Sequence, residues 1–167
     1  MVERAATVPR DGAAPTEADI RLAIGEVRDP ELPIAVTDLG LIREVTVRGS
    51  SVRVALVPTF SACPAIEVIR RDIRARVQAL PGVEEVAVDL VFDDPWTMAR
   101  MSPRGRSALA AFGLSLPQSG GEEPAACPYC GSTNTTLENP FGPTLCRAIY
   151  YCRDCRNPLE RFRPPGE

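Results

Sequence analysis

Lysine and histidine are both missing from this sequence, so all 19 basic residues among the 167 are arginines. Without histidine, the chain cannot build a Ser–His or Cys–His catalytic pair from its own residues. Without lysine, it can form neither a Schiff base nor a Walker-type phosphate loop. A transition-metal site must therefore rely mainly on cysteine, with carboxylates as the other charged ligands.

Long apolar runs are also missing, and no segment approaches the ~18 apolar residues of a membrane span. The formal net charge is −3, which gives no sign of a nucleic acid or an anionic membrane as partner. We therefore expect a cytoplasmic protein with neither kind of partner. Thiols stay reduced in the cytoplasm, so the six cysteines are more consistent with metal binding than with disulfides.

Composition divides the chain into four segments. Residues 1–15 are small and polar, and we expect a disordered leader there. Residues 16–116 have the hydrophobic patterning of a folded domain. Residues 117–126 are rich in Pro, Gly and Ser, which predicts a linker. Residues 127–167 form a second unit, and units that short usually need a metal or disulfides to fold.

Hydrophobic spacing in the first domain predicts the order helix, strand, strand, helix, strand. The first helix begins at the N-cap Thr16 and ends before Asp29-Pro30. A hairpin and a further strand alternate in polarity, and the second helix has an apolar stripe. This order predicts an α+β fold, a two-layer α-β-β-α-β sandwich. The predicted strands cover 41–47, 52–56 and 85–92, and the stripe is Ile66, Ile69, Ile73, Val77 and Leu80.

The end of the domain holds an additional helix and the only tryptophan. The helix starts at Ser102 or Pro103 and runs through Ala111, where Gly113 closes it. Trp96 could anchor this helix or face a partner, and core packing is the preferred interpretation.

Two CxxC pairs mark the second unit, Cys127–Cys130 and Cys152–Cys155. Pairs at this spacing are typical of a zinc ribbon, because two tight turns supply four thiolates at tetrahedral corners. The bound metal would contribute the folding free energy that so short a chain lacks. We therefore predict a C-terminal zinc ribbon with a structural Zn²⁺ on these four cysteines.

Two cysteines stand apart from the pairs. Cys63 lies directly before Pro64, where a strand pattern gives way to a helix pattern. As a helix N-cap it would face free backbone amides, and a lowered pKa is expected; the alternative is a small cap packed against the sheet. Cys146 lies inside the ribbon, and it is either a buried small residue or a ligand of a second, exchangeable metal or cluster.

Motifs along most of the chain resemble those of a known family. DPELPIAVTDLGLI and TFSACPA are similar to the iron–sulfur-assembly domain of SufT-type maturation factors, over residues 16–92. PWTMARMSPRGRSALAAFGLSLP and FGPTLCRAIYYC resemble the PaaD-type D subunit of the phenylacetyl-CoA 1,2-epoxidase system. That family usually has STACKALY where this chain has PTLCRAIY, so Arg147 replaces a lysine while the cysteine is kept.

The resemblance implies an accessory maturation factor for a metal centre, iron–sulfur or di-iron, of the epoxidase. Its oxygenase or reductase subunits would be the partners, and a homodimer is compatible with this role. Cys63, with Cys146, would hold iron or an iron–sulfur cluster transiently. Thr59 matches the family motif, and Asp38 would shape the loop around Cys63 or serve only as a turn residue before Gly40.

Two other functions stay open at this stage beside a general iron–sulfur carrier. Cys63 could be the nucleophile of a cysteine-dependent transferase, although only carboxylates or tyrosine could move its proton. The ribbon could instead bind nucleic acid through its arginines and aromatic residues, although a protein-binding face fits the acidic chain better. The arginines are Arg147, Arg153, Arg156, Arg161 and Arg163, interleaved with Tyr150, Tyr151 and Phe162.

Overall fold

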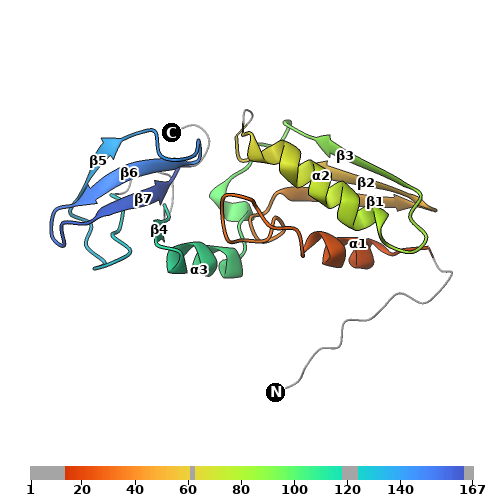
Figure 1. Cartoon of the computed structure of the whole chain (residues 1–167), viewed down its shortest axis with the longest axis horizontal. Helices are drawn as coiled ribbons and strands as arrows, with labels where there is room; N and C mark the ends of the chain where they lie inside the picture. Colours follow the sequence, from red (N-terminus) through yellow and green to blue (C-terminus); the bar gives the residue numbers. More distant parts are fainter. Residues whose placement is uncertain (1–13, 61–62, 118–123, 164–167) are drawn as a thin grey trace, which may run out of the picture.

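The computed structural model describes residues 14–60, 63–117 and 124–163. An α+β domain and a smaller β ribbon lie end to end, connected by helix α3 and strand β4 (Figure 1). The expected leader and most of the expected linker lie outside the described residues. Within the described part of the chain, no helix is long and apolar enough to cross a membrane.

The sheet of the first domain has three strands in the order β1-β2-β3: Ile42–Arg48, Ser51–Leu56 and Glu85–Leu90. β1 and β2 form the predicted antiparallel hairpin, and β3 pairs with β2 in parallel. The central strand β2 buries Val52, Val54 and Leu56 while alternate residues face outward. This period of two is what places one face of the sheet in the core.

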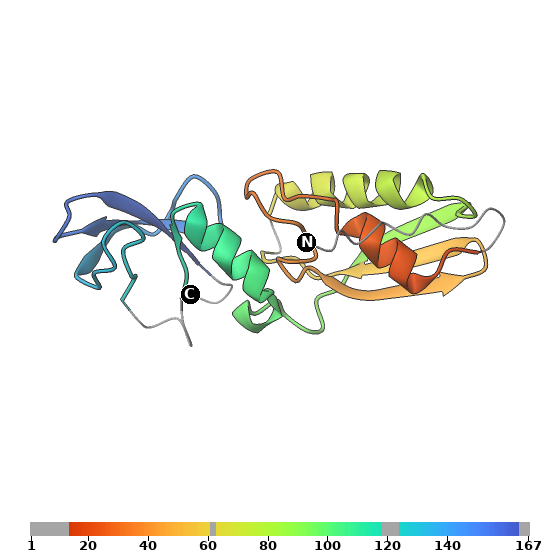
Figure 2. The same ribbon diagram turned by 90° about the horizontal axis from the view of Figure 1, so that it is seen from below.

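Two helices, α1 (Glu17–Ile24) and α2 (Ala65–Gln78), cover one face of this sheet (Figure 2). Thr16 caps α1 as predicted, because its Oγ1 accepts a hydrogen bond from the Asp19 amide at 3.2 Å. α2 turns most of its predicted stripe into the core, with Ile66, Ile69, Ile73 and Val77 buried. The predicted α+β sandwich is therefore confirmed.

Two elements end earlier than their sequence patterns suggested. α1 ends at Ile24, because the chain turns there and Arg28 forms an antiparallel bridge with Ala35. β3 ends at Leu90, opposite the last residue of β2, so the chain beyond it has no strand to pair with. Phe92, the last residue of the predicted strand 85–92, lies outside β3 and is 56% exposed.

The region between the two units contains a 3₁₀ turn, Met98–Arg100, and then α3, Pro103–Ala111. Ser102 is the N-cap and accepts a hydrogen bond from the Gly105 amide at 3.0 Å. Pro103 takes the first helical position, where its missing amide costs nothing. Gly113 follows with φ of +90°, a conformation that favours glycine.

The ribbon is a four-stranded sheet in the order β4-β7-β6-β5. β5 (Thr135–Asn139), β6 (Arg147–Cys152) and β7 (Pro158–Phe162) are antiparallel neighbours. β4, Leu114–Ser115, adds a parallel strand beside β7. The ribbon sheet thus includes residues that precede the expected linker at 117–126. The expected domain boundary at 116 stays a prediction.

The two units share one hydrophobic core. Phe162 of β7 is fully buried, and its ring lies 5.5 Å from that of Trp96. Trp96 is itself 2% exposed and donates its indole N–H to the carbonyl of Leu39 at 2.9 Å. The preferred interpretation of Trp96 as a core residue is confirmed, and the core it joins extends into the ribbon.

Candidate functional site

Four cysteine sulfurs gather at the far end of the ribbon. The Sγ atoms of Cys127, Cys130, Cys152 and Cys155 all lie within 4.8 Å of one another. Cys127 and Cys155 are 3.6 Å apart, and Cys130 and Cys152 are 3.7 Å apart. Sulfurs on a tetrahedral zinc, each about 2.3 Å from the metal, would be about 3.8 Å apart. The donor set therefore fits Zn²⁺ with little rearrangement.

Local turns present these sulfurs, as the CxxC spacing predicted. In the first turn, the amide of Gly131 donates to the carbonyl of Cys127 at 2.8 Å, with Gly131 at a φ of +75°. In the second, Arg156 donates to the carbonyl of Cys152 at 2.9 Å. Asp154 joins the two turns by accepting hydrogen bonds from the side chains of Ser132 and Asn134.

Cys63 lies in the α+β domain, directly before the N-cap of α2. It precedes the N-cap Pro64, so it is not itself the N-cap, and the prediction of that position was wrong. Burial raises the pKa of the Cys63 thiol, and the hydrogen bond from the Ala65 amide only partly offsets this. The expected lowering of the pKa is therefore also wrong, because the sulfur is half-buried against the core.

Cys146 is the second isolated thiol, and the structure brings it toward Cys63. It directly precedes β6 and is 6% exposed, within the same hydrophobic cluster against which Cys63 packs. Arg163, whose amide donates to the carbonyl of Cys146 at 2.8 Å, places its guanidinium 5.7 Å from the centre of the Phe60 ring, and the carbonyl of Phe60 accepts a hydrogen bond from the Cys63 amide. The charge of Cys146 raises the pKa of Cys63. Burial raises the pKa of Cys146 as well, and the Thr144 hydroxyl, 3.2 Å from its sulfur, acts in the opposite direction.

Two carboxylates that the sequence reasoning missed as site residues act on both thiols through their charge. Asp29 and Glu31 both raise the pKa values of Cys63 and Cys146 through their charge. Asp29 is oriented by the amides of Glu31 and Leu32, at 2.7 and 3.0 Å, and burial raises its own pKa. Their signal in the sequence is the family motif DPELP, which was noted as a match and not as a ligand set.

Asp38 and Thr59 have different surroundings. Asp38 faces α3, where it accepts hydrogen bonds from the hydroxyl of Ser102 at 2.8 Å and from Arg104. These contacts of the Asp38 carboxylate lead to α3, and a role of Asp38 in shaping the loop around Cys63 stays a prediction. Thr59 is buried in the segment that leads to Cys63.

Two arginines of the ribbon contact the α+β domain. The Arg147 guanidinium donates to the carbonyl of Glu31 and to the carboxylate of Glu160, both at 2.7 Å. The Arg163 guanidinium lies 5.7 Å from the centre of the Phe60 ring. Within the arginine and aromatic cluster of the ribbon, Arg147 and Arg161 are buried and Phe162 lies in the core, whereas Arg153 and Arg156 are exposed.

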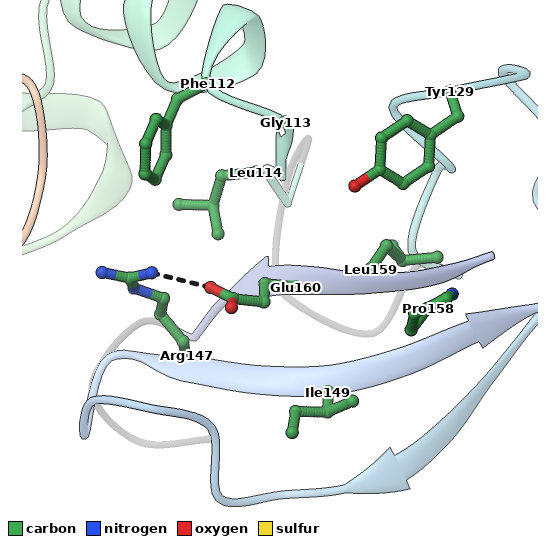
Figure 3. Close-up of a pocket in the computed structure, with 9 residues that line it drawn as sticks. All are labelled: Phe112, Gly113, Leu114, Tyr129, Arg147, Ile149, Pro158, Leu159 and Glu160. Carbon is green, nitrogen blue, oxygen red and sulfur yellow. Dashed lines mark hydrogen bonds and ion pairs between the residues drawn. The ribbon is translucent and has the colours of Figure 1, made fainter.

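A cavity of about 410 Å³ lies between the end of α3 and the ribbon (Figure 3). Its walls are mainly apolar, with the half-exposed rings of Phe112 and Tyr129 on its outer side. The ion pair of Arg147 and Glu160 lies at one end. The cavity therefore adjoins the contact between the two units.

Comparison with protein families divides the chain as the fold does. Residues 17–89 match a family described as "Iron-sulfur cluster assembly protein". Residues 114–163 match the "PaaD zinc beta ribbon domain". The second match begins at β4, in agreement with the pairing of β4 in the ribbon sheet.

Individual relatives extend these matches. A protein of Escherichia coli (strain K12), whose assigned name is that of a 1,2-phenylacetyl-CoA epoxidase D subunit, is 35% identical over 97% of this chain and 99% of its own length. A Porphyromonas gingivalis protein named as an Fe-S protein maturation auxiliary factor is 41% identical over 52% of this chain and 84% of its own.

A solved structure supports the fold of the first domain. It is a domain of unknown function from Bacillus anthracis, 29% identical, with a TM-score of 0.54. The alignment covers 56% of this chain and 90% of that one. The matched part therefore corresponds to the α+β domain that carries Cys63.

Proposed function

Because the chain belongs to the PaaD-type family of epoxidase D subunits and contains an iron–sulfur cluster assembly domain, we propose that it is a non-catalytic maturation factor of a phenylacetyl-CoA epoxidase. It would receive iron or an iron–sulfur cluster at Cys63 and Cys146 and deliver it to an oxygenase or reductase subunit. The observation that carries this proposal is the contact between the segments that hold the two thiols. Cys63 and Cys146 pack in one hydrophobic cluster, and Arg163, whose amide binds the carbonyl of Cys146, has its guanidinium 5.7 Å from the ring of Phe60, the residue whose carbonyl accepts a hydrogen bond from the Cys63 amide.

The chemistry of this site suits a transient cargo. Thiolates are soft ligands that favour iron and iron–sulfur species. Four groups that ionise to anions, the two thiols with Asp29 and Glu31, interact there, which favours a cation. Because burial raises the pKa of both thiols, binding through both sulfurs must release their protons, which weakens the net affinity. A weakly held cargo is one that can be passed on.

The four-cysteine site has a separate, structural part in this proposal. Zn²⁺ on Cys127, Cys130, Cys152 and Cys155 would fold the ribbon outright. The folded ribbon then presents Cys146 to Cys63. The two metal sites should consequently respond independently to mutation.

Anaerobic reconstitution with ferrous iron and sulfide tests the proposal. The purified protein should gain the visible absorption of an iron–sulfur cluster, and Cys63→Ser and Cys146→Ser should each lose most of it. Both variants should keep one zinc per chain, which serves as the internal control for folding. Wild-type protein that keeps its zinc but never gains this absorption or binds iron would contradict the proposal.

The identity of the recipient is tested separately. Loaded protein should transfer its cargo to an epoxidase component faster than to an unrelated apo-ferredoxin, and tagged protein from cells grown on phenylacetate should co-purify with epoxidase subunits. Equal transfer to both acceptors, with no co-purification, would favour a general iron–sulfur carrier instead.

A transferase with Cys63 as nucleophile is less consistent with the site. Such an enzyme needs a thiolate at neutral pH, and the pKa of Cys63 is raised by burial. Thiol-dependent turnover that disappears in Cys63→Ser while cluster binding is absent in the wild type would favour this alternative.

A further inference from the structure

Two arginines close to Cys146 contact the α+β domain beside the shared hydrophobic core. We propose that Arg147 and Arg163, here called the arginine clamp, are positioning residues that hold the thiol of Cys146 toward Cys63. This inference rests on the proposed function for its biological meaning, although its geometry can be tested without any metal.

Arg147 forms the first arm of the clamp. It follows Cys146 directly, it is buried, and its guanidinium reaches out of the ribbon to the carbonyl of Glu31 at 2.7 Å. The carboxylate of Glu160 on the neighbouring strand holds the same guanidinium at 2.7 Å (Figure 3). A planar guanidinium fixed by two acceptors has little freedom. It therefore fixes where β6 begins relative to the loop that carries Glu31.

Arg163 forms the second arm. Its backbone amide donates to the carbonyl of Cys146 at 2.8 Å, and its guanidinium donates to the carbonyls of Pro140 and Leu145 at 3.0 and 3.3 Å. The same guanidinium stacks near the ring of Phe60, whose carbonyl accepts a hydrogen bond from the Cys63 amide at 3.2 Å. Arg163 thus links the loop before Cys146 to the segment before Cys63.

The loop before Cys146 is shaped to close on this clamp. The amide of Gly142 donates to the carbonyl of Arg147 at 2.9 Å. A Cβ atom at Gly142 would lie 2.8 Å from that carbonyl oxygen, which is too close. Glycine therefore allows the loop to approach the backbone of Arg147 and to bring Cys146 to the junction.

Two thiols that are held close to each other should be cross-linked efficiently by a short bifunctional reagent. We would treat the zinc-loaded protein with one equivalent of a short bifunctional alkylating reagent and measure the Cys63–Cys146 cross-link by mass spectrometry. Arg147→Met and Arg163→Met should each lower the cross-linked fraction at least fivefold and raise singly alkylated Cys63. Arg147→Lys, which can reach only one of the two acceptors, should give an intermediate fraction. A purely stabilising role would not move this ratio.

Arg153→Met is the matched control, because Arg153 lies in the ribbon and donates to Thr136 of the same unit at 2.8 Å. It should cross-link like the wild type. Wild-type cross-linking in Arg147→Met and Arg163→Met, with zinc content and melting temperature retained, would overturn the clamp. If Arg147→Met loses its zinc, Arg163→Met decides by the same criterion. If the cross-linking results agree with the arginine clamp while the wild-type protein takes up no iron or cluster, only the proposed function is refuted.

Discussion

Asp38 ties the loop before β1 to the first turn of α3 through its carboxylate. The hydrogen bond from Arg104, followed by that from Ser102, holds the pKa of Asp38 below its usual value. A carboxylate with a lowered folded pKa stabilises the protein above its unfolded pKa and loses that contribution as the pH falls through the folded pKa. The contact therefore stabilises the folded protein at neutral pH, and this stabilisation is lost in acid.

Asp38→Asn is expected to lower the free energy of unfolding at pH 7 by about 1 kcal/mol, a modest value because Arg104 is 78% exposed. The difference from wild type should shrink as the pH falls below about 4. Urea denaturation at several pH values measures both effects. Asp93→Asn removes an ion pair with Arg43 whose carboxylate is 69% exposed, and it should cost less than about 0.5 kcal/mol. Equal losses from both variants at pH 7 would contradict this account of Asp38.

At the scale of elements, α3 packs its backbone directly onto the loop before β1. A Cβ atom at Gly105 would lie 2.7 Å from the carbonyl oxygen of Asp38 and 2.9 Å from Cδ1 of Ile34. Gly105→Ala should therefore lower the free energy of unfolding by about 1–3 kcal/mol, although alanine favours helix more than glycine does. Ser107→Ala, on the exposed side of the same helix, should leave it within about 0.5 kcal/mol. Thermal denaturation of the pair measures this, and a Gly105→Ala protein as stable as wild type would show that α3 can shift away.

Elements with a clear hydrophobic period could be predicted from the sequence. The capped helix α1, the hairpin, the stripe of α2 and the group of four cysteines all follow from spacing along the chain, and the structure has them. The ends of α1 and β3 could not be predicted, because they are set by the bridge between Arg28 and Ala35 and by the length of β2.

The candidate site was predicted less completely, since it depends on which distant segments meet. Spacing alone identified Cys63 and Cys146 as isolated thiols, and only the family resemblance assigned them to one site. The direction of the Cys63 pKa shift was wrong because the burial of the thiol, which raises its pKa, depends on tertiary packing that local sequence does not show. The partners of Asp38 could not be predicted either, because Ser102 and Arg104 lie more than 60 residues away along the chain.

At the scale of the whole molecule, the shared core should make the two units unfold cooperatively. Phe162 of the ribbon is fully buried beside Trp96. Phe162→Ala should lower the free energy of unfolding by about 3–5 kcal/mol, with the melting curve of the ribbon separating from that of the α+β domain. Phe112→Ala, at a ring that is 52% exposed, should cost less than about 1 kcal/mol. Calorimetry that still shows one undisturbed transition for Phe162→Ala would argue against a shared core.

Removal of zinc should change the fluorescence of Trp96, which lies in the first domain. Trp96 is the only tryptophan in the chain and is 2% exposed beneath the ribbon. A strong chelator with a thiol-specific mercurial should unfold the ribbon, uncover Trp96 and shift its emission to longer wavelength. Cys63→Ser, which leaves the four zinc ligands intact, should show the same shift. Loss of zinc without any change in emission would mean that the contact with Phe162 survives an unfolded ribbon.

The pairing of β4 with β7 determines how the chain behaves when it is cleaved into fragments. A cut within residues 118–123 would leave Leu114 and Ser115 with the first fragment while their partner strand β7 stayed with the second. Proteolysis there should yield two pieces that still migrate as one on a sizing column. A ribbon meant to be isolated should begin ahead of Leu114, because one that begins at Cys127 would expose the unpaired margin of β7 and invite self-association.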